Sequence, residues 1–90
     1  MNKNEILKNV DLYLDILEKN GVIAKRLSSL TKKDSLDKET MLAHVAWMCA
    51  MMYEMKDIGK MNRWLGFIQG ILWNFGLYSI EDFKTHNMNI

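Results

Sequence analysis

Residues 60–75 predict one amphipathic helix: Lys60-Met61-Asn62-Arg63-Trp64-Leu65-Gly66-Phe67-Ile68-Gln69-Gly70-Ile71-Leu72-Trp73-Asn74-Phe75. At about 100° per residue, one side of this helix collects large apolar side chains, as expected for a core stripe. These are Trp64, Leu65, Phe67, Ile68, Ile71, Leu72 and Phe75. The other side holds Gly59, Asn62, Arg63, Gly66, Gln69, Gly70 and Trp73. The helix therefore has an ordinary core face and a second face of small, polar and aromatic residues.

The glycines of this second face need a physical reason. A glycine inside a helix costs roughly 0.5–1 kcal/mol relative to alanine. The spacing Gly66-x-x-x-Gly70 therefore indicates that another group approaches the backbone closely. Two interpretations remain open. Either the glycines pack against an alanine face formed by Ala43, Ala46 and Ala50 of a central helix, or they form the floor of a binding groove.

The whole chain, residues 1–90, predicts a single all-α domain, because it contains no proline and few strand-like runs of Val, Ile and Thr. Hydrophobic spacing and capping signals predict three main helices and additional short ones. The main helices are expected over residues 4–19, from near residues 35–37 to 55, and over 60–75. Residues 22–30 would form a short helix or continue the first helix after a kink, and residues 79–86 a further short helix. Asn4 and Ser79 are expected to cap helix N-termini, and Gly21 and Gly76 to end helices. Residues 31–35 would form the main loop, and residues 87–90 a polar tail.

The central helix is apolar on nearly all sides between Met41 and Met55. A chain of 90 residues can hardly surround such a helix, so the pattern predicts a homo-oligomer. Cys49 lies in this helix and is the only cysteine, which excludes an intramolecular disulfide and fits a reducing cytosol. We interpret Cys49 as a small buried hydrophobic residue.

The charge balance argues against some classes of function. The formal net charge is +1, which does not favour binding to DNA by phosphate neutralisation. The longest apolar stretch, residues 64–80, is interrupted by polar residues and glycines, and it falls short of the roughly 20 apolar residues of a membrane span. Basic residues crowd one segment, which we interpret as a solvated loop. They are Lys25, Arg26, Lys32, Lys33 and Lys38.

The second face of the helix over residues 60–75 carries groups that recognise nucleotides. Arg63 offers a planar fork to phosphate or to a purine edge. Asn62 and Gln69 can pair with the edges of bases, and Trp73 or Trp47 can stack on a base. Arg63 by itself is just as typical of a helix surface as of a nucleotide site. Trp47 or Trp73 by itself is just as typical of a hydrophobic core. The prediction of a nucleotide site therefore depends on their combination.

Enzyme and metal signatures are absent from the sequence. His44 lies one turn before Trp47, and we interpret it first as a hydrogen-bonded core or interface histidine and second as a ligand contact. The sequence contains no nucleophile elbow and no phosphate-binding Gly-Lys-Ser. His44, Cys49 and His86 fit no metal-ligand spacing. We therefore expect no enzymatic activity, no metal and no cofactor.

Several strings within about residues 42–87 resemble a widespread family of small bacteriophage proteins. They are Trp47-Met48-Cys49, Lys60-x-x-Arg63-Trp64-x-Gly66-Phe67-x-Gln69-Gly70-x-Leu72-Trp73, Gly76-x-x-Ser79-Ile80-x-Asp82 and His86-Asn87. The chain is similar in this respect to the anti-CBASS sponges, oligomers that sequester cyclic dinucleotide alarm signals without cleaving them. The resemblance implies a phage origin, a location in the host bacterial cytoplasm and 3′3′-cGAMP as the ligand.

For such a ligand, Arg63, Lys60 and the basic segment around residues 25–38 would supply a local cluster of positive charge across subunits. An alternative from another class is that the same helical surface binds and blocks a host defence protein, such as a nuclease or a CRISPR effector. The abundance of methionine would suit such an adaptable contact. A third interpretation is a purely structural assembly factor.

Overall fold

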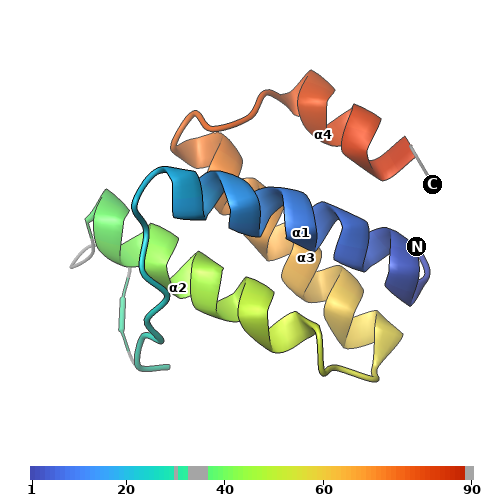
Figure 1. Cartoon of the computed structure of the whole chain (residues 1–90), viewed down its shortest axis with the longest axis horizontal. Coiled ribbons are helices and arrows are strands. Elements are labelled where there is room, and N and C mark those ends of the chain that lie inside the picture. Colours follow the sequence, from blue (N-terminus) through green and yellow to red (C-terminus); the bar gives the residue numbers. More distant parts are fainter. Residues whose placement is uncertain (30, 33–36, 89–90) are drawn as a thin grey trace.

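The computed structural model describes residues 1–29, 31–32 and 37–88, which contain helices and no strand. The helices are α1 (Lys3–Lys19), α2 (Lys38–Met52), α3 (Ile58–Asn74) and α4 (Ile80–Met88). The all-α prediction is therefore confirmed. None of these described helices combines the length and the apolar character that crossing a membrane requires. Figure 1 shows α1 crossing in front of α3, with α2 on one side of α1 and α4 on the other.

The core lies where α1, α2 and α3 meet. Tyr13 and Leu17 of α1, Met52 of α2, and Ile68 and Leu72 of α3 are all fully buried. The pairs within α1 and within α3 are each four residues apart, which places both members on the inward side of their helix. Burying a large apolar side chain contributes about 1.5–3 kcal/mol. This three-helix contact is therefore the main source of stability.

Cys49 is fully buried in α2, as predicted. Burial raises the pKa of its thiol to about 12. The thiol therefore stays protonated at neutral pH, and it packs as a small apolar group rather than as a reactive thiolate.

Polar side chains cap the helix N-termini. Asn2, Asp37 and Asp57 each accept a hydrogen bond from the backbone N–H three residues further along the chain. The prediction of Asn4 as the first cap is wrong, because the carboxylate of Glu5 closes a reciprocal capping box on Asn2 instead. α3 begins at Ile58 rather than at residue 60, because the carboxylate of Asp57 caps its N-terminus.

The helix-ending signals are confirmed. Gly21 and Gly76 follow α1 and α3, and both have φ of +75°, the left-handed conformation that glycine adopts without strain. Ahead of α4, the hydroxyl of Ser79 accepts a hydrogen bond from the N–H of Asp82, whose carboxylate accepts one from the N–H of Ser79. α4 continues to Met88, further than predicted.

The predicted short helix over residues 22–30 is wrong. Residues 22–29 form an irregular segment, here called the strap, and residue 30 lies outside the described part. The backbone N–H of Lys25 donates to the carbonyl oxygen of Ala43 at 3.0 Å, and that of Leu27 donates to Nδ1 of His44 at 3.1 Å. Because these two donors bond to α2, they do not form the hydrogen-bond ladder of a helix.

The strap also explains the apolar character of α2. Val22 and Leu27 pack against the core, so α2 has neighbours in α1, in α3 and in the strap. The apolar surface of α2, from which self-association was predicted, is thus largely covered within one chain. α2 ends at Met52 rather than at residue 55. Residues 33–36 lie outside the described part of the chain. They include Lys33, most of the loop expected over residues 31–35, and the first positions proposed for the central helix.

Candidate functional site

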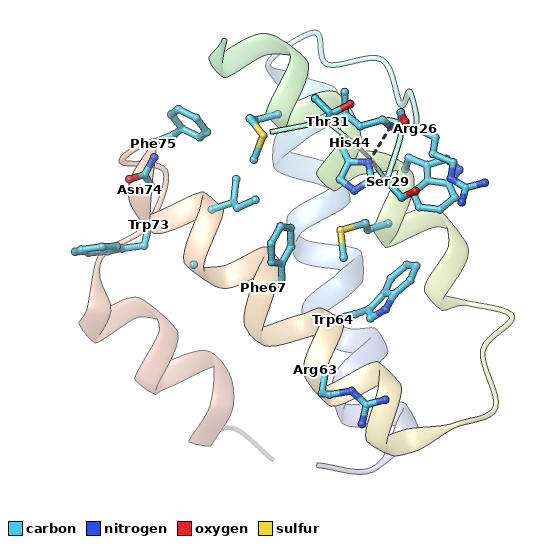
Figure 2. Close-up of a pocket in the computed structure, with 17 residues that line it drawn as sticks. Arg26, Ser29, Thr31, His44, Arg63, Trp64, Phe67, Trp73, Asn74 and Phe75 are labelled. Carbon is cyan, nitrogen blue, oxygen red and sulfur yellow. Dashed lines mark hydrogen bonds between the residues drawn. The ribbon is translucent and has the colours of Figure 1, made fainter. Parts of the chain in front are cut away.

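An open groove of about 880 Å³ lies between α2, α3 and the chain around the strap. Its lining includes His44, Trp47, Arg63, Gly70 and Trp73 of the predicted site. Figure 2 shows the side chains of α2 and the strap gathered at one end of the groove and those of the last turn of α3 at the other. The groove is therefore lined by residues that are distant from one another in sequence.

Trp47 is the centre of the α2 wall. Its indole is half-buried, with its ring centroid 5.5 Å from that of His44 and the two rings inclined by 21°. The guanidinium carbon of Arg26 lies 5.0 Å from the centroid of Trp47. A cation at this distance from an indole stabilises the contact by about 0.5–1 kcal/mol at an exposed site. The strap and α2 are thus joined through a cation–π pair.

Trp64 repeats this arrangement on α3. Its ring centroid lies 6.0 Å from that of Trp47, and Nζ of Lys60 lies 5.4 Å from the centroid of Trp64. Lys60 does not line the groove, but it brings positive charge next to it. The groove therefore contains two neighbouring indoles, each with a cation over it. Among the described residues, no acidic side chain lines the groove.

His44 connects α2 to the strap. Its Nδ1 accepts the hydrogen bond from Leu27, and since a backbone N–H can only donate, this nitrogen carries no proton. Burial, and then the nearby charge of Arg26, lower the pKa of His44 below its usual value. The ring is therefore neutral at neutral pH. This agrees with the first interpretation from sequence, a hydrogen-bonded histidine, and it also places His44 in the groove.

The structure adds groove residues that the sequence did not indicate. Phe67 was assigned to the core stripe, but its side chain is 52% exposed and lines the groove. The buried stripe of α3 is narrower and consists of Met61, Leu65, Ile68, Ile71 and Leu72. A pattern of i, i+4, i+7, i+10 and i+11 starting at Met61 matches this stripe and excludes Phe67.

Arg26, Ser29 and Thr31 also line the groove, although the basic segment was interpreted as a solvated loop. Figure 2 shows these three residues next to His44. No local pattern could reveal this position, because it depends on hydrogen bonds between the strap and α2. Arg26 and Arg63 thus place positive charge on different elements around the same groove.

Gln69 and Asn62 lie elsewhere. Nε2 of Gln69 donates hydrogen bonds to the hydroxyl of Tyr13 and to Oδ1 of Asn87, each at 2.9 Å. Gln69 therefore lies in the seam between α1, α3 and α4, where it borders a smaller hollow of about 320 Å³. Nδ2 of Asn62 donates to the carbonyl oxygen of Ile58 at 3.0 Å within α3.

The glycine pair does not pack tightly within the chain. A Cβ atom added at Gly66 or at Gly70 would meet nothing within 4 Å. The interpretation in which these glycines pack against the alanine face is therefore wrong for a single chain. Gly70 lines the groove, whereas Gly66 lies outside it. Trp73 also lines the groove and is 53% exposed, with its ring directed away from His44 (Figure 2).

Comparisons of the chain with protein-family models, with curated proteins and with solved structures found no match. The chemistry of the groove therefore carries the functional argument. Among the described residues, no group of His, Cys, Asp and Glu side chains is placed to hold a metal ion. The groove offers flat aromatic faces, cations and hydroxyl groups. These are the groups that bind a planar ring joined to an anion.

Proposed function

We propose that this protein binds a cyclic dinucleotide, such as 3′3′-cGAMP, in the groove and sequesters it without cleaving it. The observation that carries the proposal is the pair of neighbouring indoles of Trp47 and Trp64 with Arg26 and Lys60 over them. Stacking on an aromatic side chain contributes about 1–3 kcal/mol per base. Guanidinium groups bind phosphate through charge-assisted hydrogen bonds.

The size and polarity of the groove support a ligand of this class. Its volume of about 880 Å³ lies in the range of roughly 300–1,000 Å³ that is typical of small-molecule sites. A cyclic dinucleotide has two bases and two phosphates, and the groove has more than one aromatic group and arginines from two elements. Arg26 and Arg63 would contact phosphate, while Trp47 and Phe67 would contact the bases.

The biological setting of the proposal rests on the sequence resemblance around Arg63-Trp64-x-Gly66-Phe67-x-Gln69-Gly70. A phage protein in the cytoplasm of its bacterial host would remove the alarm signal by mass action. Sequestration needs affinity and an amount of protein that matches the signal. It needs no catalytic group.

A homo-oligomer is part of the proposal, and the exposed face of α3 supports it. Gly66 and Gly70 leave open space over the backbone, and Phe67 and Trp73 on the same face are about half exposed. A helix from a second copy could approach the glycines closely while covering Trp73, with the ligand and Phe67 at the edge of this contact. Such a contact would give the glycines the physical reason that a single chain does not provide.

The test is a thermal-shift panel of cyclic dinucleotides and trinucleotides, followed by chromatography of the released ligand. Ligand at 100 times its dissociation constant would stabilise the folded protein by about 2.7 kcal/mol. A selective shift with the ligand recovered intact supports sequestration. Recovery of a linear dinucleotide would contradict it, and so would a flat panel.

The second candidate function, inhibition of a host defence protein, is favoured by the exposed apolar side chains. Phe67, Trp73 and Ile80 are each more than half exposed, and they lie on α3 and α4. A flat panel together with a stoichiometric host partner that is lost on Trp73→Ala would favour this function. Retention of that partner by Trp73→Ala would exclude Trp73 from the contact, and absence of a stoichiometric partner would count against this function.

A further inference from the structure

The strap forms the one wall of the groove that is not helical among the described residues. Residues 22–29 lie outside the helices, whereas the α2 and α3 walls are held by helix ladders and by the core. Arg26 on the strap is exposed and lies over Trp47. The position of this guanidinium therefore depends on what holds the neighbouring strap backbone against α2.

His44 supplies a side chain for that attachment. The N–H of Leu27, next to Arg26 in the chain, donates to Nδ1 of His44 at 3.1 Å. A neutral imidazole can accept this bond at Nδ1, but a protonated imidazole carries hydrogen on both nitrogens and accepts at neither. Protonation of His44 would place an N–H of the ring opposite the N–H of Leu27, and two donors cannot form a hydrogen bond with each other. Protonation of His44 in acid therefore removes one hydrogen-bond acceptor from the contact between the strap and α2.

The charge of Arg26 also favours the neutral ring of His44. On the strap, Arg26 and Lys25 are cationic, and on α3 Arg63 lines the same groove. Lys38 and Glu39 lie in the first turn of α2 itself. Burial of the ring, and then the nearby charge of Arg26, lower the pKa of His44. In the free protein the ring is thus neutral over most of the physiological range, and the strap stays in place.

We propose that His44 is a positioning residue, whose neutral ring holds the strap so that Arg26 stays over Trp47 in the ligand groove. Protonation of His44 would break this attachment at Leu27, while the hydrogen bond of Lys25 to Ala43 remains. The role of His44 in ligand affinity rests on the proposed function, whereas its role in holding the strap does not. The first half of the test therefore uses the protein without ligand.

The first measurement is the NMR signal of the Leu27 amide as a function of pH, together with the ring signals of His44. The amide should shift with the same midpoint as the His44 ring. In His44→Asn the side-chain oxygen can accept the same hydrogen bond without titrating, so the Leu27 signal should stay in its bonded position throughout. The control is His86→Asn, in which the Leu27 transition should persist. A Leu27 amide that ignores His44, or that titrates equally in His44→Asn, would overturn the inference.

The second measurement is the affinity for 3′3′-cGAMP across the same pH range. The wild-type protein should lose about tenfold or more in affinity once His44 is protonated, at a pH below the usual histidine value of about 6.5. The affinity of His44→Asn should not change over this pH range. Equal losses in both proteins would overturn the role of His44 in binding. If the ligand binds at no pH, the proposed function fails, and the Leu27 titration alone still decides whether His44 holds the strap.

Discussion

The side-chain amide of Gln69 donates a hydrogen bond to the hydroxyl of Tyr13 at 2.9 Å, which joins α3 to α1 beneath α4. The hydroxyl of Tyr13 also lies 2.7 Å from Nδ1 of His86. Since that hydroxyl accepts from Gln69, its own proton is available to His86. Gln69 therefore belongs to a polar seam that attaches α4, rather than to the groove on the other side of α3.

Replacing Gln69 tests this assignment. Gln69→Ala should lower the free energy of unfolding by about 1–3 kcal/mol, because it leaves partly buried groups of Tyr13 and Asn87 without their partner. Urea denaturation measures the change. Asn74→Ala, an exposed substitution on the same helix, should change the value by about 0.5 kcal/mol or less. The folded Gln69→Ala protein should bind cyclic dinucleotide like the wild type, and a selective loss of affinity would return Gln69 to the site.

High pH should weaken the fold through Tyr13. Burial is the largest cause that raises the pKa of Tyr13 to about 12, from 10.0 in a model peptide. Between these values the unfolded chain releases a proton that the folded protein keeps, so stability decreases as the pH rises. Urea denaturation from pH 9 to about pH 12 should show this decrease. In Tyr13→Phe the alkaline slope should be smaller, and an unchanged slope would exclude Tyr13 as its source.

The glycine face offers a test that separates folding from assembly. Gly66→Ala and Gly70→Ala place methyl groups in open space, so together they should stabilise the single chain by about 1–2 kcal/mol through helix propensity. If this face contacts a second copy, sedimentation should show weaker self-association of the double variant. Gly76→Ala is the control, and it should destabilise the protein because its φ is +75°. Undiminished assembly in the double variant would exclude the glycine face as the contact.

Arg26 should contribute more to ligand affinity than its neighbour in the chain. Loss of a hydrogen bond to a charged group costs about 1.5–3 kcal/mol, so Arg26→Ala should weaken cyclic dinucleotide binding about tenfold or more. Lys25→Ala is the matched control, since Lys25 lines a different hollow and keeps its backbone bond to Ala43. Fluorescence titration of the two variants gives the comparison. Equal affinities would place the anion away from the strap.

Much of the fold could be predicted because its signals are local. The absence of proline, the stops at Gly21 and Gly76 and the cap at Ser79 are properties of short segments. The strap could not be predicted in this way. Ile23 and Leu27 have the i, i+4 spacing of a short helix. The backbone donors of Lys25 and Leu27 are instead bonded to α2, and this tertiary contact outweighs local propensity.

The lining of the candidate groove could be predicted only in part. Trp47 and Arg63 were identified by residue type and helical position, and both line the groove. Arg26 was expected only as part of a basic segment that reaches the ligand across subunits, whereas the fold of the strap brings it over Trp47 of the same chain, 21 positions further along. Gln69 was assigned to the wrong surroundings for a similar reason, since its partner Tyr13 is 56 residues away. Sequence periodicity identifies the faces of a helix, but not which neighbour covers each face.

The most direct test of the account is a calorimetric titration of 3′3′-cGAMP into the wild-type protein and into Trp47→Leu, with analysis of the ligand afterwards. Leucine keeps the apolar contact of this position but removes the stacking face. The account predicts saturable binding to the wild type, recovery of intact ligand, and an affinity for Trp47→Leu that is weaker by about 1–3 kcal/mol. Absence of binding to the folded wild type, or equal affinity for both proteins, would contradict it.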